Sequence, residues 1–377
     1  MMNKERAMIF PYDGNTAPLL RNSKFIDNYD MVLPCTFESW NLDSRDAAFA
    51  DGGSKIGIQA RSDFSKCLKD VDVVIFVEGS QAIARGELIY PKMYEAIAQG
   101  KKIIDLLEFN ELEAEMKSYS LNHNVKYITC RNDTDHWRCN KDIVAEGLLD
   151  VNIPIVLVVG EGKDTGKFLT ELKLTERLER KGYKVSLIGS NDCCKLVGGK
   201  PFPAFMRDNG MTDVEQVLLF NRYIKYVEEL EKPDLILLGV PGGVISCTKR
   251  IYGDFGILAY KVSQAIKADF VMMNLFYEEY PDSVFEDIHK MFQYRFGMNV
   301  DLIGISNHHV DWEELVGAGT TFIPSLVLSE EFLEERMKAM NRRGTYSLIN
   351  LLSDSDMDKA AETIENTLSE GNAGFVF

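Results

Sequence analysis

The strongest chemical signal in the sequence is a glycine-rich octapeptide between an apolar run and a helix-length amphipathic segment. Its residues are Gly160, Glu161, Gly162, Lys163, Asp164, Thr165, Gly166 and Lys167, called the glycine loop below. Glycines let successive backbone N–H groups turn toward one anion, a helix N-terminus adds a partial positive charge, and a lysine adds a full one. The octapeptide therefore predicts a phosphate-binding loop, with Lys167 as the catalytic residue that neutralises developing charge.

The glycine loop departs in two ways from the common Walker A pattern. Five residues separate Gly160 from Gly166, where the common pattern has four. Phe168 follows Lys167, where a Ser or Thr hydroxyl normally reaches Mg²⁺. Thr170 carries the nearest hydroxyl, and we predict it as a metal ligand. A plain glycine-rich turn between strand and helix is the alternative interpretation of the whole loop.

A carboxylate for the metal is expected after another predicted strand. Asp192 follows the run Val185–Ile188, which places it at the sheet edge that carries the glycine loop. Oxygen ligands suit Mg²⁺, so we predict Asp192 as a metal-binding catalytic residue. The alternative is an Asx turn that leaves the strand. The neighbouring Cys193 and Cys194 could supply a nucleophile, although no His-Cys metal spacing accompanies them.

The turns after two further strands could complete a nucleotide site. Gly242 and Gly243 follow the run Leu235–Leu238, and their backbone N–H groups would face a phosphate or acyl oxygen. That strand lacks the acidic residue with which a Walker B strand usually ends, which weakens the case for ordinary ATP hydrolysis. Asn274 follows Phe270–Met273, and we predict that its amide reads a base.

Two histidines follow the run Leu302–Ile305, in the segment Ser306-Asn307-His308-His309. Imidazole titrates near neutrality, so either ring could act as a general base or a substrate contact. The alternative is a solvated loop.

Short β-branched runs alternate with helix-length amphipathic stretches, a pattern typical of α/β folds with parallel sheets. The first half predicts strands at Ala7–Phe10, Asp30–Leu33, Val71–Phe76, Lys102–Asp105 and Val125–Thr129, and a helix over Gln81–Gln99 ended by Gly100. The second half predicts strands at Ile155–Val159, Val185–Ile188, Leu235–Leu238, Phe270–Met273, Leu302–Ile305 and Thr321–Ile323. Its helices are expected at Gly166–Lys181, Asp213–Leu230, Phe255–Ile266, Ser283–Phe296, Ser329–Met340 and Asp356–Ser369.

These patterns predict an N-terminal Rossmann-like α/β domain over residues 1–148 and a C-terminal P-loop NTPase-like parallel-sheet domain over residues 149–377. No G-x-G-x-x-G follows the first strand, so NAD binding has little support. Polar segments that follow strands in the first half, Tyr12–Thr16 and Glu78–Ser80, predict either a substrate site or simple turns.

The composition excludes several classes of protein. The net charge of −16 over 377 residues argues against a broad surface for nucleic acid or anionic lipid. No stretch approaches the ~20 apolar residues of a membrane span, and no apolar signal segment follows Met1–Ala7. Seven cysteines, an odd number, favour a reducing compartment, so we expect a cytoplasmic protein.

The five-residue spacing of the glycine loop resembles the P-loop of dethiobiotin synthetase and its relatives. The layout also resembles a family of two-domain proteins that includes D-glutamate N-acetyltransferases, through the loop, the segment Gly189–Asp192 and the turn Gly239–Gly243. In dethiobiotin synthetase-like proteins a Glu stands where Gly239 or Val240 stands here. Taken whole, the chain resembles a peptide-maturation-system family encoded beside radical-SAM maturases. That resemblance implies a precursor peptide, a maturase or an acyl-carrier-like protein as partner; a homodimer is left open.

Three functional hypotheses follow. The first is an ATP-dependent transferase or ligase that modifies a ribosomally made peptide, with ATP and Mg²⁺ as cofactors. The second is an acyltransferase whose loop binds coenzyme A or a phosphopantetheine carrier, for which neither a hydroxyl ligand nor a Walker B acid is needed. The third is a non-catalytic scaffold of a maturation complex with a degenerate nucleotide site.

Overall fold

The protein is described here by a computed structural model that covers residues 4–79, 84–107, 110–129, 145–246, 253–310, 325–343 and 346–372. The chain divides into two compact units, one of Met1–Arg131 with Lys195–Val197 and one of Asn132–Cys194 with Gly198–Phe377. The domain boundary expected between residues 148 and 149 stays a prediction, and the strand expected at Thr321–Ile323 lies outside the described residues.

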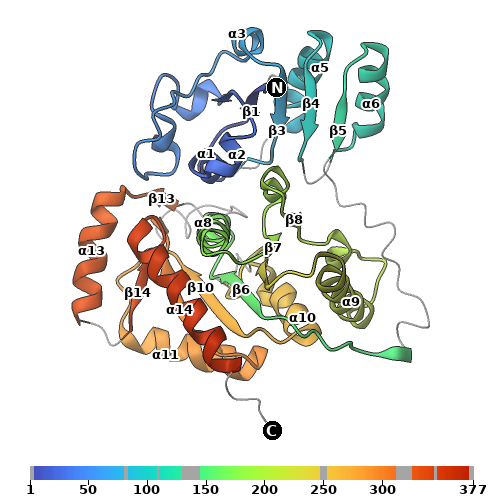
Figure 1. Cartoon of the computed structure of the whole chain (residues 1–377). Coiled ribbons are helices and arrows are strands. Elements are labelled where there is room, and N and C mark those ends of the chain that lie inside the picture. Colours follow the sequence, from blue (N-terminus) through green and yellow to red (C-terminus); the bar gives the residue numbers. More distant parts are fainter. Residues whose placement is uncertain are drawn as a thin grey trace. The chain divides into compact units, whose positions relative to one another are not determined.

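The first unit is built on a five-stranded parallel sheet in the order β2-β1-β3-β4-β5 (Figure 1). Its strands are β1 (Arg6–Phe10), β2 (Met31–Pro34), β3 (Val73–Phe76), β4 (Lys102–Asp105) and β5 (Tyr127–Thr129). Its α-helices are α1 (Ala17–Arg21), α2 (Ser23–Ile26), α3 (Phe64–Cys67), α4 (Arg85–Leu88), α5 (Tyr90–Ala98) and α6 (Glu113–Asn122). This parallel, doubly wound order confirms the Rossmann-like prediction.

The second unit carries a seven-stranded parallel sheet in the order β14-β11-β10-β6-β9-β7-β8. Its strands are β6 (Ile155–Gly160), β7 (Val185–Gly189), β8 (Lys200–Pro201), β9 (Leu235–Gly239), β10 (Phe270–Leu275), β11 (Leu302–Ile305) and β14 (Leu348–Asn350). A separate antiparallel pair joins β12 (His308–Val310) and β13 (Ser325–Val327). The glycine loop leaves β6, which lies inside the sheet between β10 and β9.

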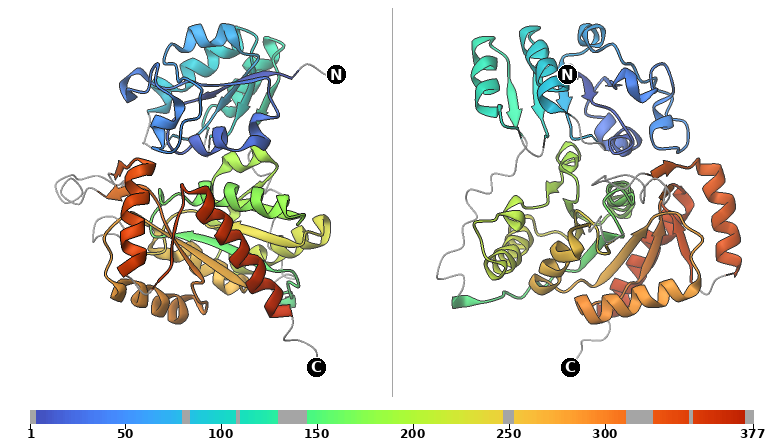
Figure 2. Two further views of the ribbon diagram at one scale, coloured as in Figure 1. Left: turned by 60° about the vertical axis from the view of Figure 1, so that its left-hand side comes forward. Right: turned by 180° about the vertical axis from the view of Figure 1, so that it is seen from behind.

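Helices cover both faces of this sheet (Figures 1 and 2). The α-helices are α8 (Lys167–Arg180), α9 (Asp213–Glu231), α10 (Ile257–Ala265), α11 (Asp282–Met291), α13 (Glu330–Arg343) and α14 (Asp354–Asn372). Helices α8 and α14 contact each other and one face of the strands. On the other face, Leu157 and Val159 share a buried cluster with Phe220 and Ile224 of α9 and Val262 of α10. Burial on both faces explains the near-continuous apolar run in β6.

Two predicted helices were wrong in extent for reasons of backbone chemistry. Residues 81–83 of the helix expected over residues 81–99 lie outside the described residues. The remainder divides into α4 and α5, because Pro91 has no N–H to continue the first helix and instead occupies the first turn of the second. The helix expected from Phe255 begins at Ile257, since Gly256 adopts a left-handed φ of 70°. Gly100, by contrast, has the left-handed φ of 74° that its expected position after a helix requires.

Within the described part of the chain, no helix combines the length and the hydropathy that crossing a bilayer requires.

Candidate functional site

The glycine loop links the carboxyl end of β6 to the start of α8. Gly160 is the last residue of β6, and a Cβ there would lie 2.1 Å from Thr165 Oγ1. The fully buried Thr165 donates through Oγ1 to the Gly162 carbonyl oxygen at 3.1 Å, which fixes the loop internally. Gly166 precedes the helix with a φ of 71°, a conformation that favours glycine. Gly160 and Gly166 thus each meet a specific steric or conformational demand.

Lys167 is the most buried cation of the loop, with 4% of its surface exposed. Its Nζ donates to the carbonyl oxygens of Gly162 at 2.6 Å, Lys163 at 3.0 Å and Gly242 at 2.8 Å. The ammonium therefore connects the loop to the turn that follows β9. Meanwhile the backbone N–H groups of Gly162, Lys163, Asp164 and Gly166 have no backbone acceptor among the described residues. A positive charge beside free amide donors is the arrangement that binds anions.

The turn after β9 packs directly on the glycine loop. Val244 N donates to the Gly160 carbonyl oxygen at 2.9 Å. A Cβ on Gly243 would lie 2.5 Å from the Glu161 carbonyl oxygen and 2.9 Å from Gly162 Cα, so this contact needs a glycine. Gly242 has a left-handed φ of 79°, and its carbonyl accepts from Lys167. Gly242 and Gly243 thus lie against the loop, as parallel strand ends predict.

Glu161 joins the loop to the segment that follows β10. Its Oε2 accepts from Phe276 N at 3.2 Å and from the Tyr280 hydroxyl at 3.0 Å. Burial raises the pKa of this carboxyl, although both hydrogen bonds act in the opposite direction. The exposed Lys163 and the half-buried Asp164 form the outer part of the loop.

Asn274 and Thr170 form a buried pair behind the loop. Asn274 pairs with Gly160 across the sheet, and its Nδ2 donates to Thr170 Oγ1 at 2.9 Å. Thr170 Oγ1 also donates to the Gly166 carbonyl oxygen at 3.1 Å. Both side chains are fully buried, so their predicted roles in base reading and metal binding would require rearrangement; both stay predictions.

Asp192 follows β7, which is separated from β6 by β9. The aspartate thus lies at the expected sheet edge, two strands from the glycine loop. Its predicted metal role stays untested. Across the described residues, no three His, Cys, Asp or Glu side chains converge into a ready-made metal site. Magnesium sites that use one or two carboxylates plus phosphate oxygens do not need such a cluster.

Cys194 packs tightly beneath the same strand end. A Cβ on Gly189 would lie 2.6 Å from Cys194 Cβ, and one on Gly199 would lie 3.1 Å from it. Cys193 and Cys194 are both buried, and burial raises the pKa of the Cys194 thiol well above its usual range. A nucleophilic cysteine needs the opposite shift and some exposure, so this geometry favours packing.

The histidine segment is held by the β12–β13 pair. His308 Nδ1 lies 3.1 Å from Ser325 Oγ, and His309 Nδ1 lies 3.1 Å from the Tyr277 carbonyl oxygen. Ser306, earlier in the same segment, lies close to the loop: a Cβ on Gly166 would lie 3.7 Å from its Cβ.

Glu171 is a site residue that the sequence patterns did not reveal. It lies one helical turn after Lys167 on α8, and its side chain is fully buried. Its Oε2 accepts from Ser190 N at 3.0 Å, at the end of β7. Desolvation by burial raises the pKa of this carboxyl to about 7. The available signal was its spacing of four residues from Lys167, which puts both side chains on one helix face.

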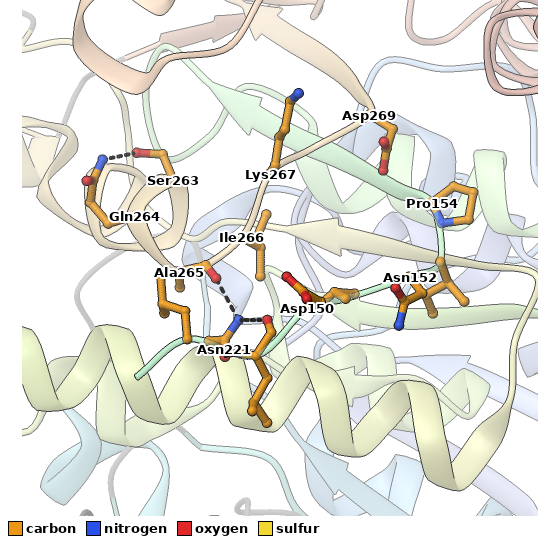
Figure 3. A pocket seen from close by; sticks show the side chains of 14 residues that line it. Asp150, Asn152, Pro154, Asn221, Ser263, Gln264, Ala265, Ile266, Lys267 and Asp269 are labelled. Atoms are coloured by element: carbon orange, nitrogen blue, oxygen red, sulfur yellow. Dashed lines mark hydrogen bonds between the residues drawn. The ribbon is translucent and has the colours of Figure 1, made fainter. Parts of the chain in front are cut away.

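A pocket of about 530 Å³ lies at the opposite edge of the sheet (Figure 3). It is lined by residues 148–154, which lead into β6, and by residues 263–267 and Asp269, which lead into β10. Asn221 of α9 donates to the carbonyl oxygens of Leu149 and Ala265, both at 2.9 Å, and so fixes one wall. Because the strands are parallel, this amino edge is remote from the loop, and the pocket is not part of the candidate site.

Comparison with known proteins places the fold. No protein-family model matches the sequence, and no curated protein matches it. Among solved structures, a DUF1611 family protein from Anabaena variabilis matches with a TM-score of 0.64 and 12% identity, over 96% of this chain and 100% of that one. The shared α/β fold therefore extends over nearly the whole chain. The WlbA dehydrogenase from Bordetella pertussis, solved with NADH and UDP-GlcNAcA, matches 44% of this chain and 50% of its own at a TM-score of 0.27 and 14% identity.

Proposed function

We propose that the glycine loop binds the phosphate groups of ATP or a similar nucleotide, and that the protein uses this ligand in a transfer or ligation reaction. One observation carries the proposal: the buried ammonium of Lys167 belongs to the same loop as four backbone N–H groups that have no backbone acceptor in the described chain. A neutral loop with such donors gains more from binding a polyanion than from facing water.

Lys167 would act by exchanging partners. In the described structure its Nζ is satisfied by three carbonyl oxygens, which are neutral acceptors. Phosphate oxygens carry full charge, and hydrogen bonds between charged groups are the stronger ones. Positioned positive charge is also the main protein contribution to phosphoryl transfer, because little covalent chemistry is left to the side chains.

The finer parts of the proposal rest on the resemblance to peptide-maturation proteins. They are a ribosomally made peptide as acceptor and a maturase or acyl-carrier-like partner. A cytoplasmic location is proposed separately, from the cysteine content and the lack of an apolar span in the sequence. Mg²⁺ would supply charge neutralisation at the phosphates, with Asp192 and Thr170 as the ligands predicted from the sequence.

A second candidate is an acyltransferase that binds coenzyme A or a phosphopantetheine carrier. Phe168 favours it, because this 7% exposed side chain occupies the position of the usual Mg²⁺-binding hydroxyl. The hydroxyl of Thr170 already donates to Gly166 and accepts from Asn274.

Calorimetric titration of the full chain with ATP, ADP and acetyl-CoA, each with and without Mg²⁺, tests the proposal. We expect ATP to bind, and Lys167→Ala to weaken binding by about ten- to a hundred-fold, or ~1.5–3 kcal/mol. Lys163→Ala, in the exposed part of the same loop, is the matched control for charge. Tighter binding of acetyl-CoA than of ATP would favour the acyltransferase, and binding of neither ligand would leave only the scaffold hypothesis.

A further inference from the structure

One oxygen of the Glu171 carboxylate has no partner although it is buried. Oε2 accepts from Ser190 N, but Oε1 makes no hydrogen bond within the described part of the chain. An unsatisfied buried acceptor lowers the stability of a protein, and a charged one lowers it further. Such groups in native proteins call for an explanation, such as a bound ion or a catalytic role.

Gly239 defines the space in which this carboxylate lies. A Cβ on Gly239 would lie 2.0 Å from Glu171 Oε1 and 2.4 Å from its Cδ. Gly239 is the last residue of β9, and it pairs with Val158 of β6. The carboxylate therefore occupies the place of a side chain at the end of β9, although it reaches that place from α8.

The end of β9, where the Glu171 carboxylate lies, is a suitable position for a metal ion that accompanies a phosphate ligand. In P-loop enzymes an acidic residue at the end of a strand neighbouring the loop holds Mg²⁺. Here the same strand continues into the turn whose Gly242 carbonyl accepts from Lys167. Carboxylate oxygens are suitable Mg²⁺ ligands, and the ion normally takes its other ligands from phosphate and water.

We propose that Glu171 binds the divalent cation that accompanies the phosphate ligand, and so replaces on helix α8 the acid that strand β9 lacks. This inference rests on the proposed nucleotide binding. It adds a metal ligand that the sequence pattern places elsewhere, at Asp192.

The test compares Glu171→Gln with the control Glu176→Gln, a carboxylate further along α8 that pairs with Arg180 at 2.6 Å. Calorimetry with ATP is run with and without Mg²⁺. We expect Mg²⁺ to tighten ATP binding by about tenfold or more in the native protein and in the control. In Glu171→Gln this enhancement should disappear, while affinity for metal-free ATP stays equal or increases.

A second variant distinguishes loss of the metal ligand from misfolding of Glu171→Gln. In Glu171→Ala/Gly239→Glu the carboxylate returns to β9, where the truncated helix residue leaves room for it, so the Mg²⁺ enhancement should return. Full enhancement in Glu171→Gln would overturn the inference but leave nucleotide binding intact, as would ATP binding that ignores Mg²⁺ in the native protein. No binding of any phosphate ligand would overturn the proposed function and the inference together.

Discussion

In the five-stranded sheet the aspartates at the ends of β1 and β4 accept hydrogen bonds from nearby donors, whereas in the second unit Glu171 Oε1 and Asn274 Oδ1 have no hydrogen-bond partner among the described residues. Thr36 Oγ1, which follows β2, is the one buried side-chain atom of the described part of the first unit that also lacks a partner. After β1, Asp13 Oδ1 accepts from Asn15 N at 2.9 Å. At the end of β4, the buried Asp105 accepts from Leu107 N at 3.0 Å and from the Tyr127 hydroxyl at 2.6 Å. These hydrogen bonds give the residues a structural role in turns, one of the two interpretations that the sequence left open for Tyr12–Thr16.

An ion pair in the first unit likewise makes its hydrogen bonds within that unit. Arg21 donates from Nε and Nη2 to the two carboxylate oxygens of Asp51, both at 2.7 Å, and from Nη1 to the Ser54 carbonyl oxygen. Gly53 leaves room for the guanidinium, since a Cβ there would lie 2.6 Å from Arg21 Nη2. The pair is bidentate and mostly buried, so the two charges neutralise each other within the unit.

The second unit differs near the glycine loop, where, among the described residues, four backbone N–H groups lack backbone acceptors and Glu171 Oε1 lacks a donor. The difference teaches that charge and polarity at a strand end do not by themselves mark a site. A buried donor or acceptor without a partner is the better indicator of a functional site, because the protein retains it at a cost in stability. Four predictions test this contrast.

Removing the carboxylate of Asp51 should have the largest effect on stability. Asp51→Ala leaves the buried guanidinium of Arg21 without its partner, which commonly costs about 3–5 kcal/mol. Urea denaturation of the full chain measures the loss, and ATP affinity at low denaturant should not change. Asp70→Ala, which breaks the exposed ion pair between Arg61 and Asp70, is the control and should cost at most about 1 kcal/mol. Equal losses in the two variants would contradict the contrast.

Phe168→Thr tests the unusual residue of the glycine loop. Loss of the buried ring should lower stability by about 3 kcal/mol, measured by thermal denaturation. The added hydroxyl should at the same time tighten ATP binding in the presence of Mg²⁺. Phe168→Leu is the control, because it keeps an apolar side chain and adds no hydroxyl. Destabilisation without a gain in Mg²⁺-dependent affinity would favour the acyltransferase.

Gly239→Ala should destabilise the second unit through a steric clash. Its Cβ would meet Glu171 Oε1 at 2.0 Å and Ser190 N at 2.8 Å, and such overpacking typically costs about 1–3 kcal/mol. The penalty should shrink when Glu171 is also replaced by Ala, with a coupling energy of about 0.5–3 kcal/mol in a double-mutant cycle of urea denaturation. Strict additivity would show that the two residues do not share this space.

The smallest expected effects come from single hydroxyl groups, one in each unit. Thr165→Val removes the hydrogen bond to Gly162, and Tyr127→Phe removes those to Asp105 and from Asn110. Both keep most of the side-chain shape, so the first should cost about 1 kcal/mol of stability and the second about 2 kcal/mol. Only Thr165→Val should also weaken phosphate-ligand binding, since Thr165 fixes the glycine loop. An equal loss of phosphate-ligand affinity in Tyr127→Phe would contradict the assignment of the binding site to the second unit.

Local pattern predicted most of the fold. Strand β6 and its loop, the long helices α8 and α9, and the left-handed Gly100 all follow from apolar periodicity and glycine chemistry. The short strands β8 and β14 were missed, because runs of two or three residues become strands only when a neighbouring strand supplies hydrogen bonds. Their position at the two edges of the sheet is determined by the tertiary structure.

The sequence by itself determined the glycine loop and Lys167, because the loop, the strand before it and the helix after it are consecutive, and the hydrogen bonds of Thr165 and Lys167 to Gly162 are local. Only the tertiary structure decided which side chains surround it. Glu171 stands out only beside Gly239, whose missing side chain leaves space for its carboxylate. The two residues are distant in sequence and lie side by side because β9 pairs with β6. A glycine at a strand end and a glutamate on a helix carry no signal separately. Their relation exists only in three dimensions, where the side chain of one fills the space that the other leaves.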